Sequence, residues 1–363
     1  MKKPKVLTLV GTRPELIRLS RIIPKLDLYT DHVFVHSGQN YDKNLKEVFF
    51  TELEIRNPDI VIESKSDSFG EQIGIILKEI EKIFKKIKPD FFLILGDVNT
   101  CLACIIAERM GIPTIHLEAG NRCYDLKVPE EVNRRIIDHT SSWNLPYTIK
   151  SKHNLLHEGI ENKTIFVSGN PIKEVILHYK VKWEKSSILN QLGLEKKKYL
   201  LVTTHRAENV DKKKRLKNIF DSFEILAKKY DLPIIISVHP RTRSKLQEFD
   251  IQITHEQIKL CEPFGLFDFL KLEKEALLVI TDSGTVQEEC CLFRVPTVTI
   301  RDTTERPETV ECGSNCLAGT DPHRVVNSVT LMLDTDNNWF IPEGYDVSNV
   351  SSRVLNFILS LEY

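Results

Sequence analysis

The chain has 363 residues, more than one hydrophobic core usually serves, so its length predicts two domains. Its 50 Lys and Arg residues nearly balance its 51 Asp and Glu residues, for a formal net charge of −1. No overall charge therefore attracts nucleic acid or an anionic membrane, and any anion site must be local. No apolar run approaches the roughly 20 residues that span a bilayer, which predicts a cytoplasmic protein.

The eight cysteines predict neither a disulfide framework nor a metal site. The chain is large and carries no secretion signal, so we expect reduced thiols that pack as small apolar side chains. Two pairs are closely spaced, Cys101 with Cys104 and Cys312 with Cys316. A zinc site would need two such pairs in tetrahedral company, and packing is the simpler interpretation.

Strand and helix patterns alternate through the first half of the chain. The apolar strands are nearly continuous, which is typical of a parallel sheet that is buried on both faces. Strands are predicted at 5–10, 33–36, 59–62, 91–95, directly before Glu118, and at 164–167. Helices are predicted at 15–26, around Leu45, Val48, Phe49 and Leu53, and at 69–86, 99–110 and from Pro129.

The second half repeats the alternation. Its strands are predicted at 199–204, 233–238, 258–261, 277–280 and 296–300, with helices that include 215–229 and 285–293. A stretch rich in Lys and Glu, 179–198, is the predicted linker, and the chain closes on a helix at about 350–361. Neither half contains a Gly-x-Gly-x-x-Gly fingerprint or a Walker loop, which argues against NAD and ATP as ligands.

These patterns predict an α/β fold of two doubly wound parallel-sheet domains that face a central cleft. The first domain would span 1–178 and the second 179–349. In such sheets, ligands bind beyond the carboxyl ends of the strands, where loops and helix N-termini meet. The residues predicted at those ends are polar and come from both halves: Arg13, Asp97, Glu118, His205, Arg206, His239, Ser283, Gly284 and Arg301.

The second half supplies a candidate anion site. Asp282-Ser283-Gly284-Thr285 precedes a helix, whose free N–H groups and dipole favour phosphate oxygens. An ordinary N-cap by Ser283 or Thr285 is an equally good interpretation. His205 could donate a proton, although a His at a strand end is more often a structural hydrogen-bonding group. Phe269, five residues after Phe264, could stack on a base or lie in the core.

The first half supplies candidate acids and bases. Asp97, Glu118 and Glu130 lie at or near strand ends, and carboxylates that gather in a dry cleft raise at least one pKa toward neutrality. Any of the three could instead cap a helix or pair with Arg122 or Arg134. Arg13, next to a proline, could likewise be a surface charge at a helix start.

Over essentially its whole length, the sequence resembles the non-hydrolysing UDP-N-acetylglucosamine 2-epimerases. The shared motifs are Gly11-Thr12-Arg13-Pro14-Glu15, Gly96-Asp97, His116 to Gly120, Pro129 to Arg134, His205-Arg206, Thr281 to Gly284, Gln287-Glu288-Glu289 and Arg301 to Glu308. The last motif, Arg301 to Glu308, is long and rarely found elsewhere.

The resemblance implies a glycosyltransferase-B architecture of two Rossmann-like domains, with the final helix, 350–363, packed back on the first and UDP bound by the second. It also implies inversion at carbon 2 of a UDP-N-acetylhexosamine through elimination and re-addition of UDP. Asp97, Glu118 and Glu130 would handle the proton on carbon 2. Arg13, His205 and the helix start at Ser283-Gly284 would hold the diphosphate, Glu289 the ribose and Phe269 the uracil. The complete candidate set is catalytic Asp97, Glu118, Glu130 and His205, and substrate-binding Arg13, Arg18, Arg134, Arg206, Phe264, Phe269, Ser283, Gly284, Thr285, Glu289 and Arg306.

Three positions depart from the family pattern. Arg18 replaces a usual lysine, which keeps the charge but changes its geometry, and Thr285 replaces a second glycine. Gly38-Gln39-Asn40-Tyr41-Asp42 differs from the Gly-Gln-His-Arg pattern with which many bacterial members bind a second, activating UDP-N-acetylglucosamine. The same stretch, with Gly120 to Cys123, looks more like the branch that acts on modified sugars.

The leading expectation is conversion of UDP-N-acetylglucosamine to UDP-N-acetylmannosamine for surface polysaccharide synthesis. The alternatives are the same reaction on UDP-2,3-diacetamido-glucuronate or UDP-6-deoxy-N-acetyl-talosamine, a hydrolysing epimerase, and a non-catalytic nucleotide-sugar sensor. The expected partner is a UDP-sugar, with no cofactor, metal, nucleic acid or membrane. A homodimer is implied by the resemblance alone.

Overall fold

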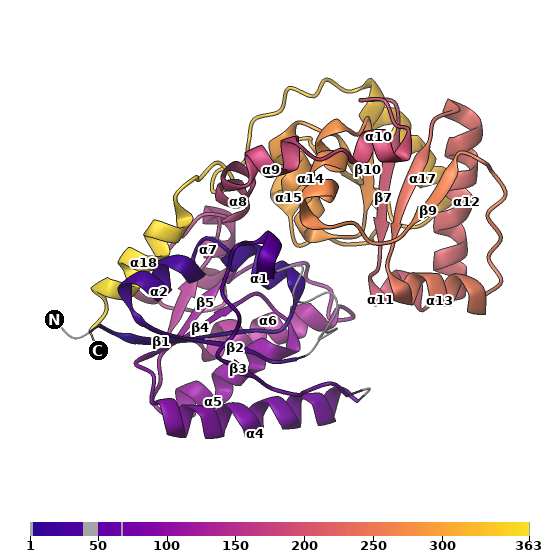
Figure 1. The fold of residues 1–363 in the computed structure, drawn as a ribbon. Helices are drawn as coiled ribbons and strands as arrows, with labels where there is room; N and C mark the ends of the chain where they lie inside the picture. The colour runs from indigo at the N-terminus through magenta and orange to yellow at the C-terminus, as the bar shows by residue number, and fades with distance from the viewer. Residues whose placement is uncertain (1–2, 39–49, 67, 363) are drawn as a thin grey trace. The chain divides into compact units, whose positions relative to one another are not determined.

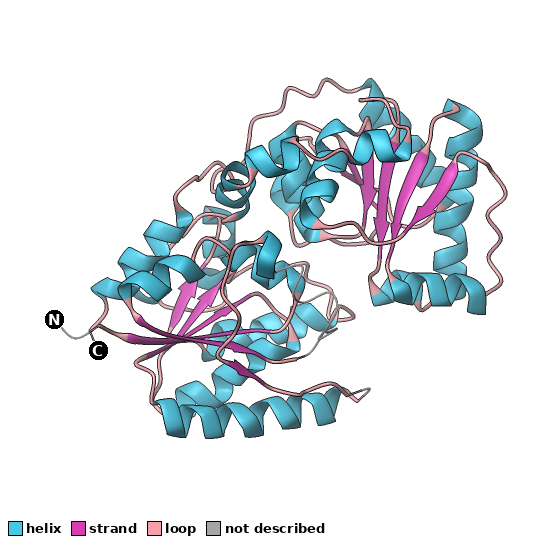
Figure 2. Cartoon of the chain, viewed as in Figure 1, coloured by secondary structure: helices cyan, strands magenta, loops and turns pink. Residues whose placement is uncertain are grey.

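The computed structural model describes residues 3–38, 50–66 and 68–362 (Figure 1). The chain forms two compact units, one of Met1–Leu177 with Glu343–Tyr363 and the other of His178–Pro342. Each unit is a parallel sheet with helices on its faces (Figure 2). The predicted α/β class with two Rossmann-like parallel-sheet units is therefore confirmed.

Unit 1 contains a six-stranded parallel sheet in the order β3-β2-β1-β4-β5-β6. The chain moves outward from β1 to β3 and then returns to place β4 beside β1, which creates a switch point where the loops after these two strands diverge. The strands are β1 (Lys5–Val10), β2 (Asp31–His36), β3 (Ile60–Val61), β4 (Phe91–Leu95), β5 (Thr114–Leu117) and β6 (Trp143–Leu145).

The helices of unit 1 bury apolar faces against this sheet, with Ile76, Ile80 and Phe84 of α4 among the buried side chains. The helices are α1 (Arg13–Leu19), α2 (Ile23–Tyr29), α4 (Phe69–Ile87), α5 (Cys104–Arg109), α6 (Pro129–Thr140), α7 (Ile149–His157), α8 (Ile172–His178) and α18 (Val350–Ser360), with 3-10 turns η1 (Asn99–Ala103) and η2 (Asn162–Thr164).

Unit 2 repeats the topology with the order β12-β11-β10-β7-β8-β9. Helices α12 and α17 share one core with its strands, and α15 contacts β10 and β11. The strands are β7 (Leu200–Thr204), β8 (Ile234–Val238), β9 (Ile258–Cys261), β10 (Leu278–Thr281), β11 (Thr297–Thr299) and β12 (Asn315–Leu317). The helices are α9 (Lys180–Glu184), α10 (Ile188–Leu192), α11 (Ala207–Val210), α12 (Lys213–Tyr230), α13 (Pro240–Glu248), α14 (Leu266–Glu275), α15 (Gly284–Phe293), α16 (Pro307–Glu311) and α17 (Pro322–Asp334).

Several predicted elements are corrected by the structure. The single helix at 15–26 is two helices, because Pro24 sits in the first turn of α2 and starts a new helix. The strand at 164–167 is only a bridge between Asn144 and Ile165, and the short β6 forms the edge of the sheet instead. A helix was also predicted around Leu45, Val48 and Phe49, but these three residues lie outside the described ranges.

The predicted linker, 179–198, is folded and belongs to unit 2, where α9 buries Trp183. Residues 343–349, which the sequence analysis placed in the second domain, lie in unit 1. The amide of Asn170 donates to the carbonyl of Gly344 at 2.8 Å. A Cβ at Gly344 would lie 2.3 Å from the carbonyl oxygen of Tyr147, so this approach requires glycine.

Helix α18 packs on α2 within unit 1 (Figure 1). Its Phe357 ring lies 4.8 Å from Phe166 and 5.5 Å from Trp143, measured between centroids. The Arg353 guanidinium donates to the carbonyl of Val167 at 2.7 Å. Within the described ranges, no helix is both long enough and apolar enough to cross a membrane.

Candidate active site

The loop after β1 is closed by the carboxylate of Glu15. Its Oε2 accepts hydrogen bonds from the amides of Gly11 and Thr12, at 3.0 and 2.7 Å, and from the Thr12 hydroxyl at 2.8 Å. Burial raises the pKa of Glu15 to about 8; the hydrogen bonds oppose this rise and the charge of Asp97 adds to it. The closed loop leads into α1, whose first residue, Arg13, is half-buried.

Asp97 and Glu118 meet at one guanidinium, that of Arg134. The Arg134 Nη2 atom lies 2.5 Å from Asp97 Oδ2 and 3.0 Å from Glu118 Oε1, and Nη1 donates to the backbone carbonyl of Glu118. Arg134 is 1% exposed and the Asp97 side chain 14%. Two carboxylates from neighbouring strand ends are therefore fixed on a buried cation, and one keeps access to solvent.

Arg18 reaches the other side of Glu118. Its Nη1 lies 3.3 Å from Glu118 Oε2 and also donates to the Asn170 side-chain oxygen at 3.3 Å. The guanidinium carbon stands 5.5 Å from the centre of the Tyr147 ring. A planar guanidinium can combine these contacts, which a compact ammonium could not match, so arginine at this position has a structural reason.

The backbone of Glu118 has a φ of 66°, in the left-handed region that non-glycine residues seldom adopt. The side chain is nearly buried, at 5% exposure. Such conformations cost of order 1–3 kcal/mol and persist where surrounding contacts fix them, as Arg134 and Arg18 do here. The geometry therefore favours a fixed position for this carboxylate.

Glu130 lies in the first turn of α6, one turn before Arg134 and on the same helix face. It is half-buried, whereas its neighbour Glu131 is buried and accepts from the Cys123 amide at 2.9 Å and from Arg135. Glu131 is thus a structural carboxylate, whereas the Glu130 side chain is partly exposed to solvent.

Arg122 pairs with neither Asp97 nor Glu118, a pairing that the sequence left open. Its Nη1 lies 2.6 Å from Asp138 Oδ2, and its Nε and Nη2 donate to Glu158 at 2.8 and 2.5 Å. Asp138 was not predicted, although Glu130, Arg134 and Asp138 follow at intervals of four on α6. That spacing places all three on one helix face and was the available signal.

In unit 2, Asp282 holds the loop that follows β7. Its buried carboxylate accepts from the Thr204 hydroxyl at 2.9 Å, from the amides of His205 and Arg206 at 3.0 Å each, and from Asn209 at 3.2 Å. The His205 Nδ1 lies 3.3 Å from Asp282 Oδ1, and the His205 side chain is 45% exposed. His205 is therefore anchored on one side and open on the other.

Asp282 is followed by the N-terminus of α15. Ser283 is the N-cap residue, as the alternative interpretation predicted, although among the described residues its side chain makes no capping hydrogen bond. A Cβ at Gly284, the first helical residue, would lie 3.5 Å from the guanidinium carbon of Arg306. Arg306 is buried, pairs with Glu288, and donates to the Glu305 carbonyl at 3.2 Å. The Arg306 guanidinium, which also lies 3.6 Å from Glu305 Oε2, and the N-terminus of α15 thus lie beside one another, and a helix N-terminus favours an anion.

The remaining predicted residues of unit 2 lie on α14, α15 and the loops beside them. Phe264 precedes α14 and Phe269 lies within it, both half-buried, while Glu289 is buried on α15 and Thr285 is half-buried in its first turn. Arg206, also half-buried, is the N-cap residue of α11.

Arg301 and His239, which were also predicted at strand ends, contact side chains or amides of unit 2. Arg301 is buried, 3.2 Å from Glu208. His239 accepts from the Arg241 amide at 3.3 Å; burial lowers its pKa, and the charges of His205 and Arg241 lower it further.

In the described parts of the chain, no three His, Cys, Asp or Glu side chains are grouped so that they could hold a metal ion. Cys101 and Cys104 are buried. The Cys291 sulfur lies 3.9 Å from that of Cys312, which is a contact between thiols.

The family model described as UDP-N-acetylglucosamine 2-epimerase matches residues 26–359 of the chain. The chain belongs to this epimerase family. The resemblance predicted from its motifs is thereby confirmed, and with it membership in a family of isomerases.

Relatives within the epimerase family cover nearly the whole chain. The UDP-N-acetylglucosamine 2-epimerase of Methanocaldococcus jannaschii is 44% identical over 349 residues, which are 94% of this chain and 95% of the relative. The crystal structure of the Methanocaldococcus jannaschii enzyme in complex with UDP-GlcNAc and UDP matches with a TM-score of 0.92 at 41% identity, over 98% of this chain and 99% of that one. The UDP-2,3-diacetamido-2,3-dideoxy-D-glucuronate 2-epimerase of Pseudomonas aeruginosa is 32% identical over 98% of this chain and the whole relative.

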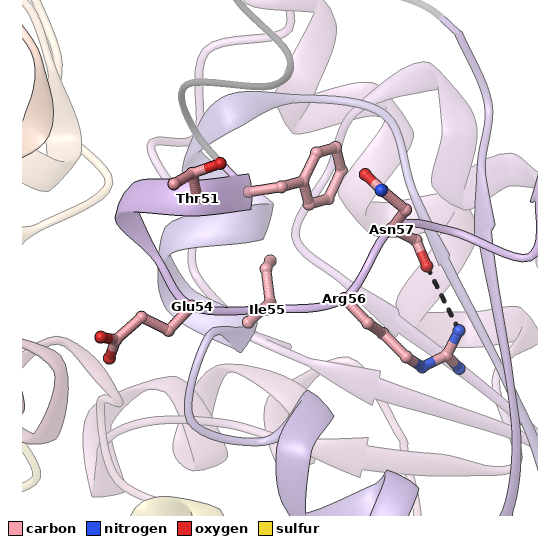
Figure 3. Close-up of a pocket in the computed structure, with 6 residues that line it drawn as sticks. Thr51, Glu54, Ile55, Arg56 and Asn57 are labelled. Carbon is pink, nitrogen blue, oxygen red and sulfur yellow. Dashed lines mark hydrogen bonds between the residues drawn. The ribbon is translucent and has the colours of Figure 1, made fainter.

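One hollow of unit 1 shares no residue with the predicted epimerase site. It is lined by Phe50, Thr51, Glu54, Ile55, Arg56 and Asn57 (Figure 3). Its arginine is fully engaged, because Arg56 donates to Asn57, Asp27 and Asp59 at 3.3, 2.9 and 2.7 Å. The stretch Gln39 to Asp42, which raised the question of activation by a second UDP-sugar, lies outside the described residues.

Proposed function

We propose that this chain interconverts UDP-N-acetylglucosamine and UDP-N-acetylmannosamine. The observation that carries the proposal is the pair Asp97 and Glu118, both held on Arg134 in a member of the epimerase family. Inversion at carbon 2 requires a proton to leave one face of the sugar and return to the other. Two carboxylates at separate strand ends, with Glu130 nearby on α6, can supply the base and the acid.

The reaction proceeds by elimination and re-addition. A carboxylate takes the proton from carbon 2, the bond from carbon 1 to the diphosphate oxygen breaks, and UDP leaves with that electron pair. The resulting 2-acetamidoglucal has a double bond between carbons 1 and 2. Protonation of carbon 2 from the opposite face and return of the diphosphate oxygen to carbon 1 give the epimer. No cofactor is needed, because no electrons are gained or lost overall.

Departure of UDP needs positive charge where negative charge develops. We assign this task to Arg13, Arg206, His205 and the helix start at Ser283, Gly284 and Thr285. The free helix amides next to Arg306 support this assignment in unit 2. Arg18 and Arg134 would orient the sugar end through their hold on Glu118.

The nucleoside would bind on α14 and α15. Glu289 would accept from the ribose hydroxyls, and Phe264 or Phe269 would stack on the uracil, since both rings are only half-buried. We further propose that the enzyme acts in the cytoplasm as a homodimer in surface polysaccharide precursor synthesis, as the family resemblance implies.

The test is turnover in deuterated water. Purified protein with UDP-N-acetylglucosamine should incorporate deuterium at carbon 2 and form UDP-N-acetylmannosamine, measured by NMR and mass spectrometry. Release of free UDP with each turnover would instead indicate a hydrolysing epimerase. Tight binding without exchange of any 2-acetamido UDP-sugar would indicate a sensor.

A modified sugar is the second candidate substrate, favoured by the Pseudomonas aeruginosa relative and the sequence Gly120-Asn121-Arg122-Cys123. Arg122, however, is buried and paired with Asp138 and Glu158, so its side chain does not face a ligand. Parallel exchange assays with UDP-N-acetylglucosamine and UDP-2,3-diacetamido-glucuronate decide between the two substrates through their kcat/KM ratio.

A further inference from the structure

We propose that His116 is a positioning residue, which together with Asp138 forms a buried charged clamp that sets the two carboxylate-bearing loops of unit 1 relative to each other. The proposal rests on the proposed epimerisation for its catalytic consequence. His116 lies in β5, and its side chain is fully buried. Neither His116 nor Asp138 needs to touch the substrate for this role.

One side of the clamp reaches the loop of Asp97. The His116 Nε2 lies 2.7 Å from the carbonyl oxygen of Gly96, the residue directly before Asp97. Gly96 has a φ of 83°, so the chain turns sharply at this point. A hydrogen bond from the imidazole therefore fixes the peptide from which Asp97 projects.

The other side reaches the loop of Glu118. The His116 Nδ1 lies 2.9 Å from Asp138 Oδ1, and the Asp138 carboxylate accepts from the Gly120 amide at 3.1 Å. A Cβ at Gly120 would lie 2.3 Å from the Ser151 carbonyl oxygen, so this loop is closely packed. The clamp thus connects the Gly96–Asp97 peptide with the Ala119–Gly120 peptide, one residue beyond Glu118, and it does so across β4, β5 and α6 (Figure 1).

The His116 ring lies between two oxygen atoms, the Gly96 carbonyl beside Nε2 and the Asp138 carboxylate beside Nδ1. Burial would raise the pKa of Asp138, but the hydrogen bond from His116 and the charges of His116, Arg122 and Arg134 hold it below its ordinary value. Arg122 and then Glu158 continue the series, so the charges alternate in sign from His116 to Glu158.

Stability alone does not account for this network. Taking charges out of water is costly, and buried ion pairs are often no better for stability than apolar side chains of the same volume. What the network does define is position, since each contact is directional. Arg134 holds the side chains of Asp97 and Glu118, at Oδ2 and Oε1, and also the Glu118 carbonyl. His116 and Asp138 instead hold the backbone of the nearby residues Gly96 and Gly120.

The first experiment compares His116→Gln with His153→Gln, an exposed histidine of α7 that serves as the matched control. The Gln amide can still donate to Gly96 but carries no charge for Asp138. We expect kcat for deuterium exchange to fall about 100-fold, the effect of a misplacement of about 1 Å, with KM and UDP affinity nearly unchanged. His153→Gln should match the wild type. Wild-type kcat in folded His116→Gln would overturn the proposal.

The second measurement is NMR spectroscopy of the wild-type protein, so it depends neither on turnover nor on the folding of a variant. In the wild-type protein labelled with 15N-histidine, a His116 N–H should show hydrogen-bond coupling to the Asp138 carboxylate or the Gly96 carbonyl, while a ring without either hydrogen bond would overturn the clamp. A third measurement returns to turnover: Asp138→Asn should lower kcat as much as His116→Gln does and should leave UDP affinity intact. If the wild type shows no exchange with any UDP-sugar, the proposed function fails, and the NMR signals of His116 still decide for or against the clamp.

Discussion

The two units have the same strand order but use their carboxylates differently. Counted within each unit, β4 and β10 are the fourth strands, each beside the first strand of its sheet. Asp97 follows β4 and Asp282 follows β10. Asp97 pairs with Arg134 and is partly open to solvent, whereas Asp282 is buried among the hydrogen-bond donors of the β7 to α11 loop.

The different surroundings of Asp97 and Asp282 depend on which carboxylate accepts hydrogen bonds from the amides of the loop after the first strand. In unit 1, Glu15 of the following helix accepts the two loop amides, of Gly11 and Thr12. In unit 2, Asp282 accepts the equivalent amides, of His205 and Arg206. Because Glu15 accepts the amides of the first loop, Asp97 is left to pair with Arg134 and keeps partial access to solvent. The same scaffold thus places its fourth-strand aspartate in different surroundings in the two units.

The largest effect on the proposed difference between the two units is expected from Glu118→Gln. The variant keeps the shape of the side chain but removes the charge at the proposed sugar end, so exchange at carbon 2 should fall by about 10²–10⁴-fold. UDP affinity, measured by calorimetry, should stay near that of the wild type. Glu161→Gln, at an exposed position of unit 1, is the control. Equal loss of exchange and UDP affinity would mean that Glu118 is structural.

Asp282→Asn and Asp97→Asn test whether equivalent aspartates have different tasks. Asp282→Asn places an NH₂ group among four donor groups, so the free energy of unfolding in urea should fall by about 2–4 kcal/mol, with weaker UDP binding. Asp97→Asn should abolish most exchange and lower stability much less. An equal loss of stability in both variants would contradict the different tasks of Asp97 and Asp282.

Glu15 gives the stability of unit 1 a dependence on pH. Its pKa is about 8 in the folded protein and 4.5 ordinarily, so the folded state holds a proton that the unfolded state releases. Stability should therefore decrease as pH rises from about 4.5 to about 8, by up to about 1.4 kcal/mol per pH unit from this group. Urea denaturation of Glu15→Gln across this range should show a shallower slope than the wild type. Parallel slopes would contradict the assignment.

The smallest expected effect is at the α15 N-terminus. Ser283→Ala removes one hydroxyl near the proposed phosphate position and should weaken UDP binding about fivefold to tenfold, the worth of one hydrogen bond. Ser68→Ala removes the N-cap side chain of α4 in unit 1 and should leave UDP affinity unchanged. If both substitutions weakened UDP equally, the anion site would not be at α15.

Much of this organisation could be predicted from the sequence, because continuous apolar runs and helical spacing report burial directly. The strands 91–95 and 258–261 were predicted with the bounds that the structure has. Strands β6 and β12 were missed because Trp143-Asn144-Leu145 and Asn315-Cys316-Leu317 each contain an asparagine and lack the β-branched residues that predicted the equally short β11. The break between α1 and α2 fell within one amphipathic pattern that continues across Pro24.

For the candidate site, the strand ends indicated which residues gather but not how they pair. Asp97 and Arg134 are 37 positions apart, and the choice between Arg134 and Arg122 as the partner of Glu118 depends on side-chain directions that the sequence does not encode locally. The sequence marks His116 only as part of a shared motif, because its contacts with Gly96 and Asp138 depend on the fold.

The return of α18 to unit 1 affects the order of assembly during synthesis. Unit 1 begins to emerge from the ribosome first, yet its last segment, Glu343–Tyr363, follows all of unit 2. At about 5–20 residues per second, unit 2 alone takes roughly 10–30 s to translate. Throughout that time, the aromatic residues Trp143 and Phe166 lack their contact with Phe357, so this part of unit 1 can be completed only after unit 2 has been translated.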